Sequence, residues 1–185
     1  GSVGGQIEVM SGALNEFQDG PTVGSAFLVA TRPPGLHYDY EVDSYLLAGF
    51  YNVQHSLSDS LRALHSLRLE HLDYDYSNKH IAGNTKDDGT ACGFGGCLYS
   101  RPASRTDSFT NVGARLGMEK DLSTGLLYAS VSSGFRPPQV TELYRLRGGQ
   151  TIADLDSERL TALEAGYKNE AVAVAAFIER TRDFL

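Results

Sequence analysis

The connections between the predicted strands of this sequence alternate strictly between long and short. Six stretches show the two-residue alternation of apolar and polar side chains that predicts β-strands, and residues 5–17 are predicted as one more strand. In residues 110–119, for example, Val112 and Leu116 share one phase, whereas Arg115 and Glu119 take the other. Most of these stretches are longer than an ordinary strand. The predicted strands span residues 5–17, 37–54, 61–76, 108–120, 125–135, 158–168 and 171–184.

The order of the connections predicts which end of the sheet each one occupies. The short ones are "SLSDS" (56–60), "DLST" (121–124) and "KNE" (168–170), and the long ones are 18–36, 77–107 and 136–157. Consecutive antiparallel strands place successive connections at opposite ends of a sheet. All long loops are therefore expected at one end and all short turns at the other. This arrangement is typical of a transmembrane β-barrel with brief turns on one side and extended loops on the other.

Aromatic residues gather near the ends of the predicted strands. Tyr51 and Tyr167 lie near short turns, and a larger group lies next to long loops: Tyr38, Tyr40, Tyr74, Tyr76, Phe109 and Phe135. Two such groups predict aromatic belts at the two interfaces of a bilayer. The alternative is that aromatic residues simply favour strand ends beside loops.

The third predicted strand, 61–76, changes phase along its length. Leu67 and Leu69 occupy odd positions, whereas Leu72 and Tyr74 occupy even ones. An inserted residue in one strand shifts the phase of everything after it. The sequence therefore predicts a β-bulge near residues 70–71.

Seven strands do not close a bacterial single-chain barrel, which has an even number and leaves no unpaired edge in lipid. The predicted fold class is therefore all-β, as an antiparallel up-and-down transmembrane β-barrel segment of a larger barrel. The first residues, "GSVGGQIEVM", lack the charged and apolar regions of a signal peptide. This start indicates either a cytoplasmic protein or a chain whose beginning is missing.

The net charge bears on the kind of partner, and the cysteine spacing bears on the compartment of the protein. The net charge of -7 argues against a nucleic-acid partner, which would require a basic face. Cys92 and Cys97 flank a Gly-rich loop that can bend enough to join them. We predict a disulfide, worth only about 2 kcal/mol for so small a loop, and hence an oxidising compartment. Two free thiols are the alternative, and the spacing does not favour zinc.

The stretch "YASVSSGFRPPQVTELYRL" (128–146) resembles a late-barrel signature of TonB-dependent outer-membrane receptors. The following "DLDSERLTALEAGYK" (154–168) is similar to the next element of that family. The matching residues, which the resemblance implies to be structural, are Gly134, Phe135, Arg136, Pro138, Glu142, Leu143, Tyr144, Glu164, Gly166 and Tyr167.

The resemblance implies that residues 1–185 are part of a β-barrel of about 22 strands, located in the outer membrane of a Gram-negative bacterium. It implies active uptake of a scarce nutrient, with a ferric siderophore as first choice, energised by the TonB complex through a plug domain. No plug domain and no TonB box are present in this sequence. The implied partners are an extracellular small ligand such as a metal chelate, outer-membrane lipid and lipopolysaccharide. No cofactor and no enzymatic activity are expected.

The long loops supply the candidate ligand contacts. Arg136, Arg145 and Arg147 make the last long loop positive, which suits an anionic ligand. The full candidate set is Arg136, Tyr144, Arg145, Arg147, Phe94 and Tyr99. The alternative is that the arginines pair within a solvated loop, with Asp154, Asp156 and Glu158, or contact lipopolysaccharide.

Other kinds of site have weaker support in the sequence. Asp87 with Asp88, and Asp154 with Asp156, could bind calcium, but solvated turns explain them as well. The five histidines lack the spacing of a helical metal site, and no metal site is predicted. No GxSxG elbow accompanies a catalytic set. An outer-membrane barrel enzyme of the protease or lipase type, and a soluble β-sandwich adhesin, remain as alternatives.

Overall fold

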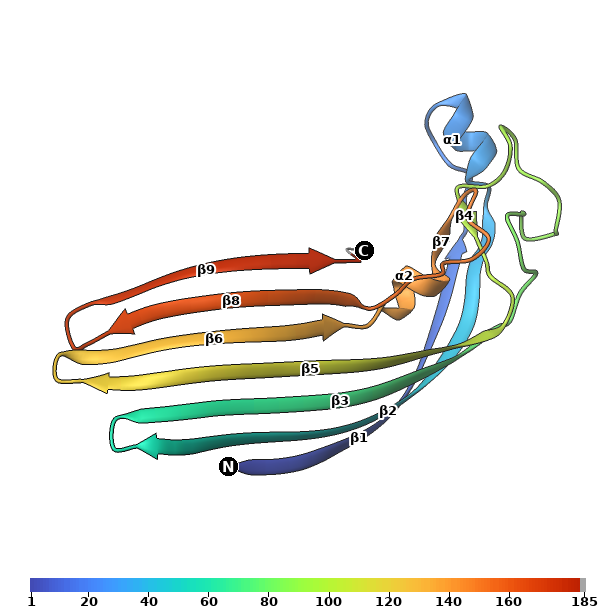
Figure 1. The fold of residues 1–185 in the computed structure, drawn as a ribbon. Helices are drawn as coiled ribbons and strands as arrows, with labels where there is room; N and C mark the ends of the chain where they lie inside the picture. The colour runs from blue at the N-terminus through green and yellow to red at the C-terminus, as the bar shows by residue number, and fades with distance from the viewer. Residues whose placement is uncertain (184–185) are drawn as a thin grey trace.

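Long strands joined in one curved sheet make up most of the computed structural model, which describes residues 1–183 (Figure 1). The sheet contains β1 (Ser2–Gln18), β2 (Gly35–Ser58), β3 (Leu61–Asn78), β5 (Arg105–Leu122), β6 (Gly125–Arg136), β8 (Glu158–Lys168) and β9 (Ala173–Arg182). Two short helices and a two-stranded sheet lie in the loops: α1 (Ala26–Thr31), β4 (Tyr99–Ser100), α2 (Val140–Tyr144) and β7 (Leu146–Arg147). No helix among residues 1–183 has the length and apolar character needed to cross a membrane.

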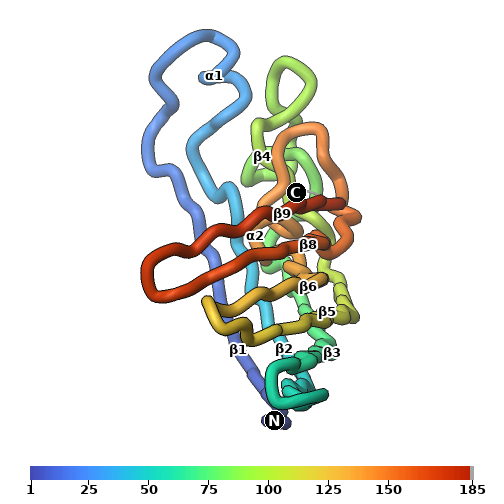
Figure 2. The backbone as a smooth tube through the Cα atoms, turned by 60° about the vertical axis from the view of Figure 1, so that its left-hand side comes forward, coloured from blue at the N-terminus to red at the C-terminus, as the bar shows by residue number. Residues whose placement is uncertain are grey.

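The strands pair antiparallel in chain order, β1-β2-β3-β5-β6-β8-β9, so the topology is up-and-down as predicted. The short turns connect β2 to β3, β5 to β6 and β8 to β9 at one end, and all three long loops lie at the other end (Figures 1 and 2). Within residues 1–183 the sheet does not close on itself, and β1 and β9 each have one strand neighbour there. An open seven-stranded sheet is what a segment of a larger barrel should show.

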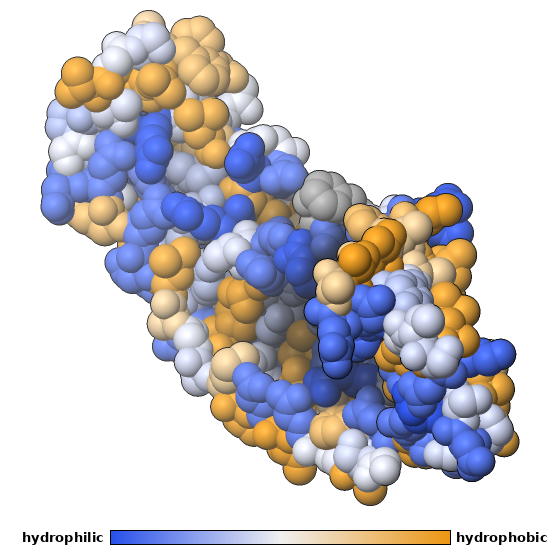
Figure 3. All heavy atoms as spheres, turned by 90° about the vertical axis from the view of Figure 1, so that its left-hand side faces the viewer, coloured by the Kyte–Doolittle hydropathy of each residue, from blue (hydrophilic) through white to orange (hydrophobic). Residues whose placement is uncertain are grey.

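One face of the sheet is apolar and exposed along most of its length. Cross-strand pairs such as Leu69 with Val112 and Val131 with Leu163 place apolar side chains side by side on this face. Its exposed members include Val3, Ile7, Val9, Tyr45, Leu47, Leu69, Val112, Leu116, Met118, Leu127, Val131, Leu163, Val174 and Ile178. Viewed from the turn end, hydrophobic residues follow the outer edge of the curved sheet and hydrophilic residues line its hollow (Figure 3). We call this surface the convex face.

The opposite face, which we call the concave face, is polar toward the turns and apolar toward the long loops. On β3 it carries Arg62 and Arg68 near the turn, followed by Leu72 and Tyr74, which are buried. The convex face of β3 changes in the reverse sense, from Leu69 to the exposed His71. Toward the long loops the concave face of β3 therefore becomes apolar and its convex face becomes polar.

This exchange explains the phase change in β3, and the predicted bulge near residues 70–71 is wrong. The pairing of β3 with β5 runs without interruption from Leu61 to Tyr76. The irregularities in register lie elsewhere, between Glu16 and Phe17 and between Ser56 and Ser58. The strand keeps its register, and its surroundings change instead. In the half of β3 next to the long loops, the loops cover the concave face.

The same cover corrects the predicted aromatic belt on the loop side. Of the six residues in that prediction, five are buried on the concave face instead of facing outward: Tyr38, Tyr40, Tyr74, Tyr76 and Phe109. Their rings pack against one another and against α2, with 5.2 Å between the ring centroids of Tyr40 and Tyr76. They form the hydrophobic core beneath the loops, so interpreting them as a lipid-facing belt is wrong.

A charge on the convex face should destabilise the protein far more than the same charge on the concave face. Leu116 is 61% exposed on the convex face of β5, and Asn52 lies exposed on the concave face of β2. For the protein folded into lipid vesicles, we expect Leu116→Lys to cost up to about 2–4 kcal/mol, the range for a lysine on the lipid-facing side of a barrel. Asn52→Lys should cost much less, because its ammonium group stays in water. Urea unfolding of both variants measures the difference, and equal costs would contradict a lipid-facing convex surface.

Candidate functional site

Three loops that are distant in the sequence meet above the concave face, and together they form what we call the loop cluster (residues 19–34, 79–104 and 137–157). Strand β4 pairs with β7, so the second and third loops share a small sheet. The Leu98 amide donates to the Thr31 carbonyl at 2.9 Å, and the Gly148 amide donates to the Leu98 carbonyl at 3.0 Å. Leu98 therefore joins all three loops through its backbone.

The "FRPP" stretch turns the chain from β6 into α2 and fixes that turn with ion pairs. The Arg136 guanidinium lies 2.9 Å from a Glu158 oxygen and 3.1 Å from a Glu142 oxygen. The Glu142 carboxylate also accepts the Gln139 amide at 2.6 Å, at the first turn of α2. Strand pairing ends at Arg136, because the next two residues are Pro137 and the buried Pro138, which cannot donate to a strand ladder. Arg136 thus pairs with Glu158 as the alternative interpretation expected, and Glu142 is a second partner.

Helix α2 packs on the strands through Leu143 and Tyr144, which are 2% and 0% exposed. The Tyr144 ring stacks on Tyr76 with 4.2 Å between centroids, and its hydroxyl donates to Asp107 at 2.7 Å. Burial is the main cause that raises the pKa of the Tyr144 hydroxyl well above its ordinary value, and the hydrogen bond to the Asp107 carboxylate raises it further. Tyr144 therefore remains a neutral donor and anchors the last loop to β5.

The remaining motif residues lie within the sheet. The Glu164 carboxylate on β8 accepts the Tyr128 hydroxyl of β6 at 2.8 Å. Gly166 pairs directly with Tyr128, and a Cβ at that position would lie 2.6 Å from the tyrosine side chain and 2.7 Å from the Val174 carbonyl oxygen. The backbone oxygen cannot move aside as a side chain can, which explains why the position favours glycine. A Cβ at Gly134 would meet nothing within 4 Å, so no contact explains that glycine.

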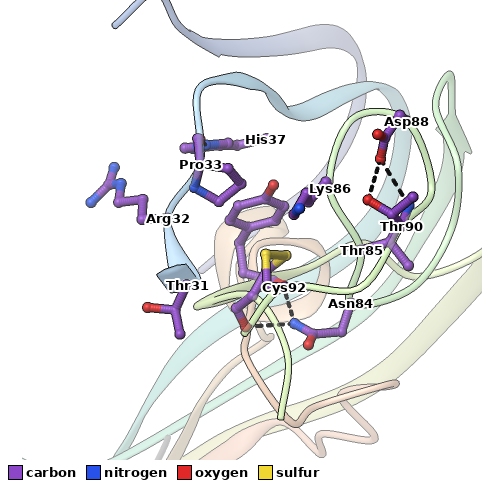
Figure 4. The surroundings of a disulfide bond; sticks show 12 residues. Thr31, Arg32, Pro33, His37, Asn84, Thr85, Lys86, Asp88, Thr90 and Cys92 are labelled. Carbon is purple, nitrogen blue, oxygen red and sulfur yellow. Dashed lines mark hydrogen bonds between the residues drawn. A yellow bond between two sulfur atoms is a disulfide. The ribbon is translucent and has the colours of Figure 1, made fainter. Parts of the chain in front are cut away.

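The predicted disulfide between Cys92 and Cys97 is present, with the two Cα atoms 5.0 Å apart (Figure 4). The loop that it closes lies against the first loop, because the Gly93 amide donates to the Ala30 carbonyl at 3.1 Å. The Asn84 side-chain amide donates to the Cys97 carbonyl at 2.6 Å from the other side. Phe94, at the tip, adopts a positive φ of 52°. The disulfide therefore fixes a small structural unit where two loops meet.

Arg101 is a charged residue in the interior of the loop cluster. It is 1% exposed, and no carboxylate pairs with it within residues 1–183. Its guanidinium instead donates to backbone carbonyls, including those of Ile81 at 2.6 Å, Thr85 at 2.8 Å and His37 at 3.2 Å. A buried charge requires such compensation to be tolerated. Arg101 thereby holds the second loop to the start of β2.

A cavity of about 740 Å³ opens where the loop cluster meets the ends of β1 and β2. Its walls carry the cations Arg32, Arg145 and Arg147, together with Glu16 and Glu142. The rest of the lining comes from His37, Tyr38, Leu98, Tyr99, Thr141, Gln150 and Leu155. The charged groups of the cavity therefore include more cations than anions.

Glu16 is the central anion of this cavity. Its carboxylate lies 3.5 Å from the Arg32 guanidinium and 3.6 Å from Nδ1 of His37, and it also accepts from Arg145. The Arg145 guanidinium lies over the Tyr38 ring, 5.7 Å from its centroid. Arg147 differs from these residues, because its guanidinium has no ion pair within residues 1–183. The cavity thus has one unpaired cation at its wall.

The structure brings together only part of the predicted ligand-contact set. Arg145, Arg147 and Tyr99 line the cavity, although Tyr99 is only 5% exposed. Arg136 and Tyr144 lie outside it, in the contacts that hold α2. The Phe94 ring contacts Phe27 at the tip of the cluster, also outside the cavity.

Sequence analysis missed Glu16, Arg32 and His37, which lie on β1, in the first loop and on β2. No local motif marks these residues. Only the pairing of β1 with β2 and the packing of the first loop bring them together. The acidic pair 87–88 has local partners: Asp87 faces His80 at 3.0 Å, and Thr90 hydrogen bonds lower the pKa of Asp88.

Replacing Arg101 should loosen the second loop without unfolding the sheet. Lysine keeps the charge but cannot reach several carbonyls at once, and each buried acceptor left unpaired costs about 1–3 kcal/mol. In Arg101→Lys we expect faster amide hydrogen exchange across residues 79–104, with unchanged exchange in β5 and β6. Arg32→Lys is the matched control, since Arg32 is half-exposed. Equal protection in Arg101→Lys and the wild type would contradict the anchoring role.

Comparison with known proteins places these features in one family. The family model described as "TonB dependent receptor-like, beta-barrel" matches residues 3–185. No curated protein sequence matches the chain. The family match spans all seven long strands and the three loops of the loop cluster, and it agrees with the antiparallel up-and-down sheet. The chain therefore belongs to the family of TonB-dependent receptor β-barrels, which are transport proteins of the Gram-negative outer membrane.

Proposed function

We propose that this chain forms part of the barrel wall and extracellular loops of a receptor that takes up an anionic metal chelate, with a ferric siderophore as the preferred class. The barrel would comprise about 22 strands, with the plug domain and TonB box outside this sequence. The observation that carries the proposal is the cation-rich cavity of the loop cluster, with Arg147 unpaired at its wall.

The electrostatics of the cavity favour an anion of moderate size. Arg32, Arg145 and Arg147 contribute three guanidinium groups, while Glu142 is already engaged by Arg136. A guanidinium presents several N–H donors in a planar fork that suits oxygen-rich anions. The cavity volume of about 740 Å³ lies in the range of small-molecule sites. An iron chelate with carboxylate, catecholate or hydroxamate oxygens fits this chemistry.

The rigidity of the loop cluster also supports binding. Its three loops share backbone hydrogen bonds, a disulfide and the buried Arg101. A preorganised site loses less conformational entropy when the ligand arrives. Members of the family are transporters and not enzymes, and in this proposal the TonB complex, acting on the plug, supplies the energy for release into the periplasm. The strands provide the wall, and the loop cluster provides the first ligand contacts.

Removing the unpaired cation should weaken ligand capture. In Arg147→Gln we expect a loss of about 1.5–3 kcal/mol in the binding of an anionic ferric chelate, the typical value for a hydrogen bond to a charged group. Lys79→Gln is the matched control, because Lys79 is also a loop cation but pairs with Glu41 at 2.7 Å, outside the cavity. Equilibrium binding to the receptor in detergent, measured with several iron sources, tests the difference.

A growth assay tests transport separately from binding. A receptor-deletion strain carrying wild-type protein should grow on an anionic ferric siderophore as sole iron source. The same strain carrying Arg147→Gln should require more of that siderophore, while Lys79→Gln behaves like the wild type. Rescue by a non-iron nutrient alone would keep the transport role but reject the siderophore. Equal binding by Arg147→Gln and the wild type would reject the cavity as the ligand site.

A further inference from the structure

Two histidines on neighbouring strands face each other near the turn end of the sheet. His55 on β2 and His65 on β3 lie 10 residues apart in the sequence, and their Nε2 atoms are 3.0 Å apart. The ring centroids are 5.1 Å apart and the ring planes differ by 15°. The rings therefore lie nearly head to head, with each Nε2 directed at the other.

This pair differs from the other histidines of the chain. His37 faces Glu16, His71 faces Asp73 at 3.3 Å, and His80 faces Asp87 at 3.0 Å. His55 and His65 have no carboxylate partner within residues 1–183, and each has the other as its polar partner. A neutral imidazole nitrogen is the form that binds metals, and within residues 1–183 no carboxylate competes for either Nε2 atom.

The surroundings leave one side of the pair open. His55 is exposed and His65 is half-buried, and both point to the convex face on the turn side of Tyr51. The Tyr51 ring packs edge-on against His65 with 5.5 Å between centroids. The strand partners of His65 are Val53 and Leu116, which carry no ligand atoms. A tyrosine at this height fits a bilayer interface, so the pair lies at the margin of the apolar surface.

We propose that His55 and His65 form a two-histidine site for a divalent transition-metal ion such as Zn²⁺, Cu²⁺ or Ni²⁺. Imidazole nitrogens bind these metals at about 2.0–2.1 Å, and two nitrogens in adjacent coordination positions then lie about 3 Å apart, which is the spacing of the Nε2 atoms here. Because the two Nε2 atoms now point at each other, both rings rotate on binding so that their lone pairs converge on the metal. Both rings bind through Nε2. The histidine that donates in the present hydrogen bond moves its proton to Nδ1, which leaves its Nε2 free to bind the metal.

The composition of the site sets its selectivity and strength. Imidazole suits zinc, copper and nickel, whereas calcium and magnesium require oxygen ligands. Within residues 1–183 no group of three or more metal-binding side chains occurs. Water therefore completes the coordination shell, and the metal stays exchangeable. Once bound, it joins β2 to β3 at the opposite end of the sheet from the loop cluster, so this site is separate from the proposed ligand cavity.

The test uses protein isolated from outer membranes in detergent, with any affinity tag removed. Titration with Zn²⁺ in a calorimeter should give one saturable site per chain, and Ca²⁺ should give none. The electron paramagnetic resonance spectrum of bound Cu²⁺ should show splitting from two nitrogen ligands. His55→Gln and His65→Gln should each weaken Zn²⁺ binding at least tenfold. His71→Gln is the matched control, since His71 is also exposed on β3 and instead contacts Thr110 at 2.8 Å.

Several outcomes would overturn the site. The first is that wild-type protein shows no saturable Zn²⁺ binding. The second is that either His55→Gln or His65→Gln binds Zn²⁺ as tightly as the wild type, and the third is that His71→Gln loses Zn²⁺ affinity to the same extent. A copper spectrum with a single nitrogen ligand would also reject the paired site, even if metal binds. Circular dichroism of each variant serves as the control for an intact sheet. None of these readouts depends on transport, so failure of this site leaves the proposed ligand cavity untouched.

Discussion

The register of the inter-strand hydrogen-bond ladder is the constraint on which the other features depend. Because side chains alternate strictly across a strand, a slip of one residue would exchange the two faces of the whole sheet. β3 keeps a continuous register with β5 from Leu61 to Tyr76. Its residues must therefore suit two environments in succession on each face. A strand of 18 residues is longer than the 9–11 or so that cross a bilayer, so its loop-side half lies beyond the apolar band and needs a cover of its own.

The loop cluster provides that cover, and the motif around residues 134–144 makes it possible. A strand that continued in solvent with Tyr74 and Tyr76 exposed would leave a large apolar surface. Instead Pro138 ends the pairing, Arg136 fixes the turn, and Tyr144 stacks on Tyr76. The family signature is therefore explained mainly by packing. Its arginine and tyrosine resemble ligand contacts in the sequence because charged and aromatic residues serve both purposes.

The sequence was sufficient to predict the strands, the turns and the up-and-down order, because each depends on local alternation and on short polar connections. The disulfide between Cys92 and Cys97 was also predictable, since its partners are close along the chain. The exchange of faces along β3 was not, because alternation alone cannot reveal that surroundings change while the register stays constant. A phase change in a strand much longer than a bilayer crossing is better interpreted as a change of environment than as a bulge.

Contacts between distant segments could not be predicted from local sequence patterns. Glu16 meets Arg145 across 129 residues, and His55 meets His65 only through the β2–β3 register. Helical spacings do not reveal this contact, because it crosses a hairpin. His55 pairs with Ala63 and His65 pairs with Val53, so the two histidines are diagonal neighbours on one face of the β2–β3 ladder. No local pattern would have found Glu16, whose partners come from two loops and a strand.

The position of Glu16 has a consequence for how the proposed receptor would respond to its ligand. Its carboxylate holds Arg145 of the third loop and Arg32 of the first loop to the end of β1. An anion entering the cavity competes with that carboxylate for the same guanidinium groups, after first meeting the unpaired Arg147. Any exchange of Glu16 for the ligand weakens the ties between two loops and the strand. Because the carboxylate is partly exposed, each tie is modest in solvent, so a ligand with several anionic oxygens could replace them. Capture of the ligand would then replace side-chain ties to Glu16, while the backbone hydrogen bonds, the disulfide and Arg101 keep the loops in place.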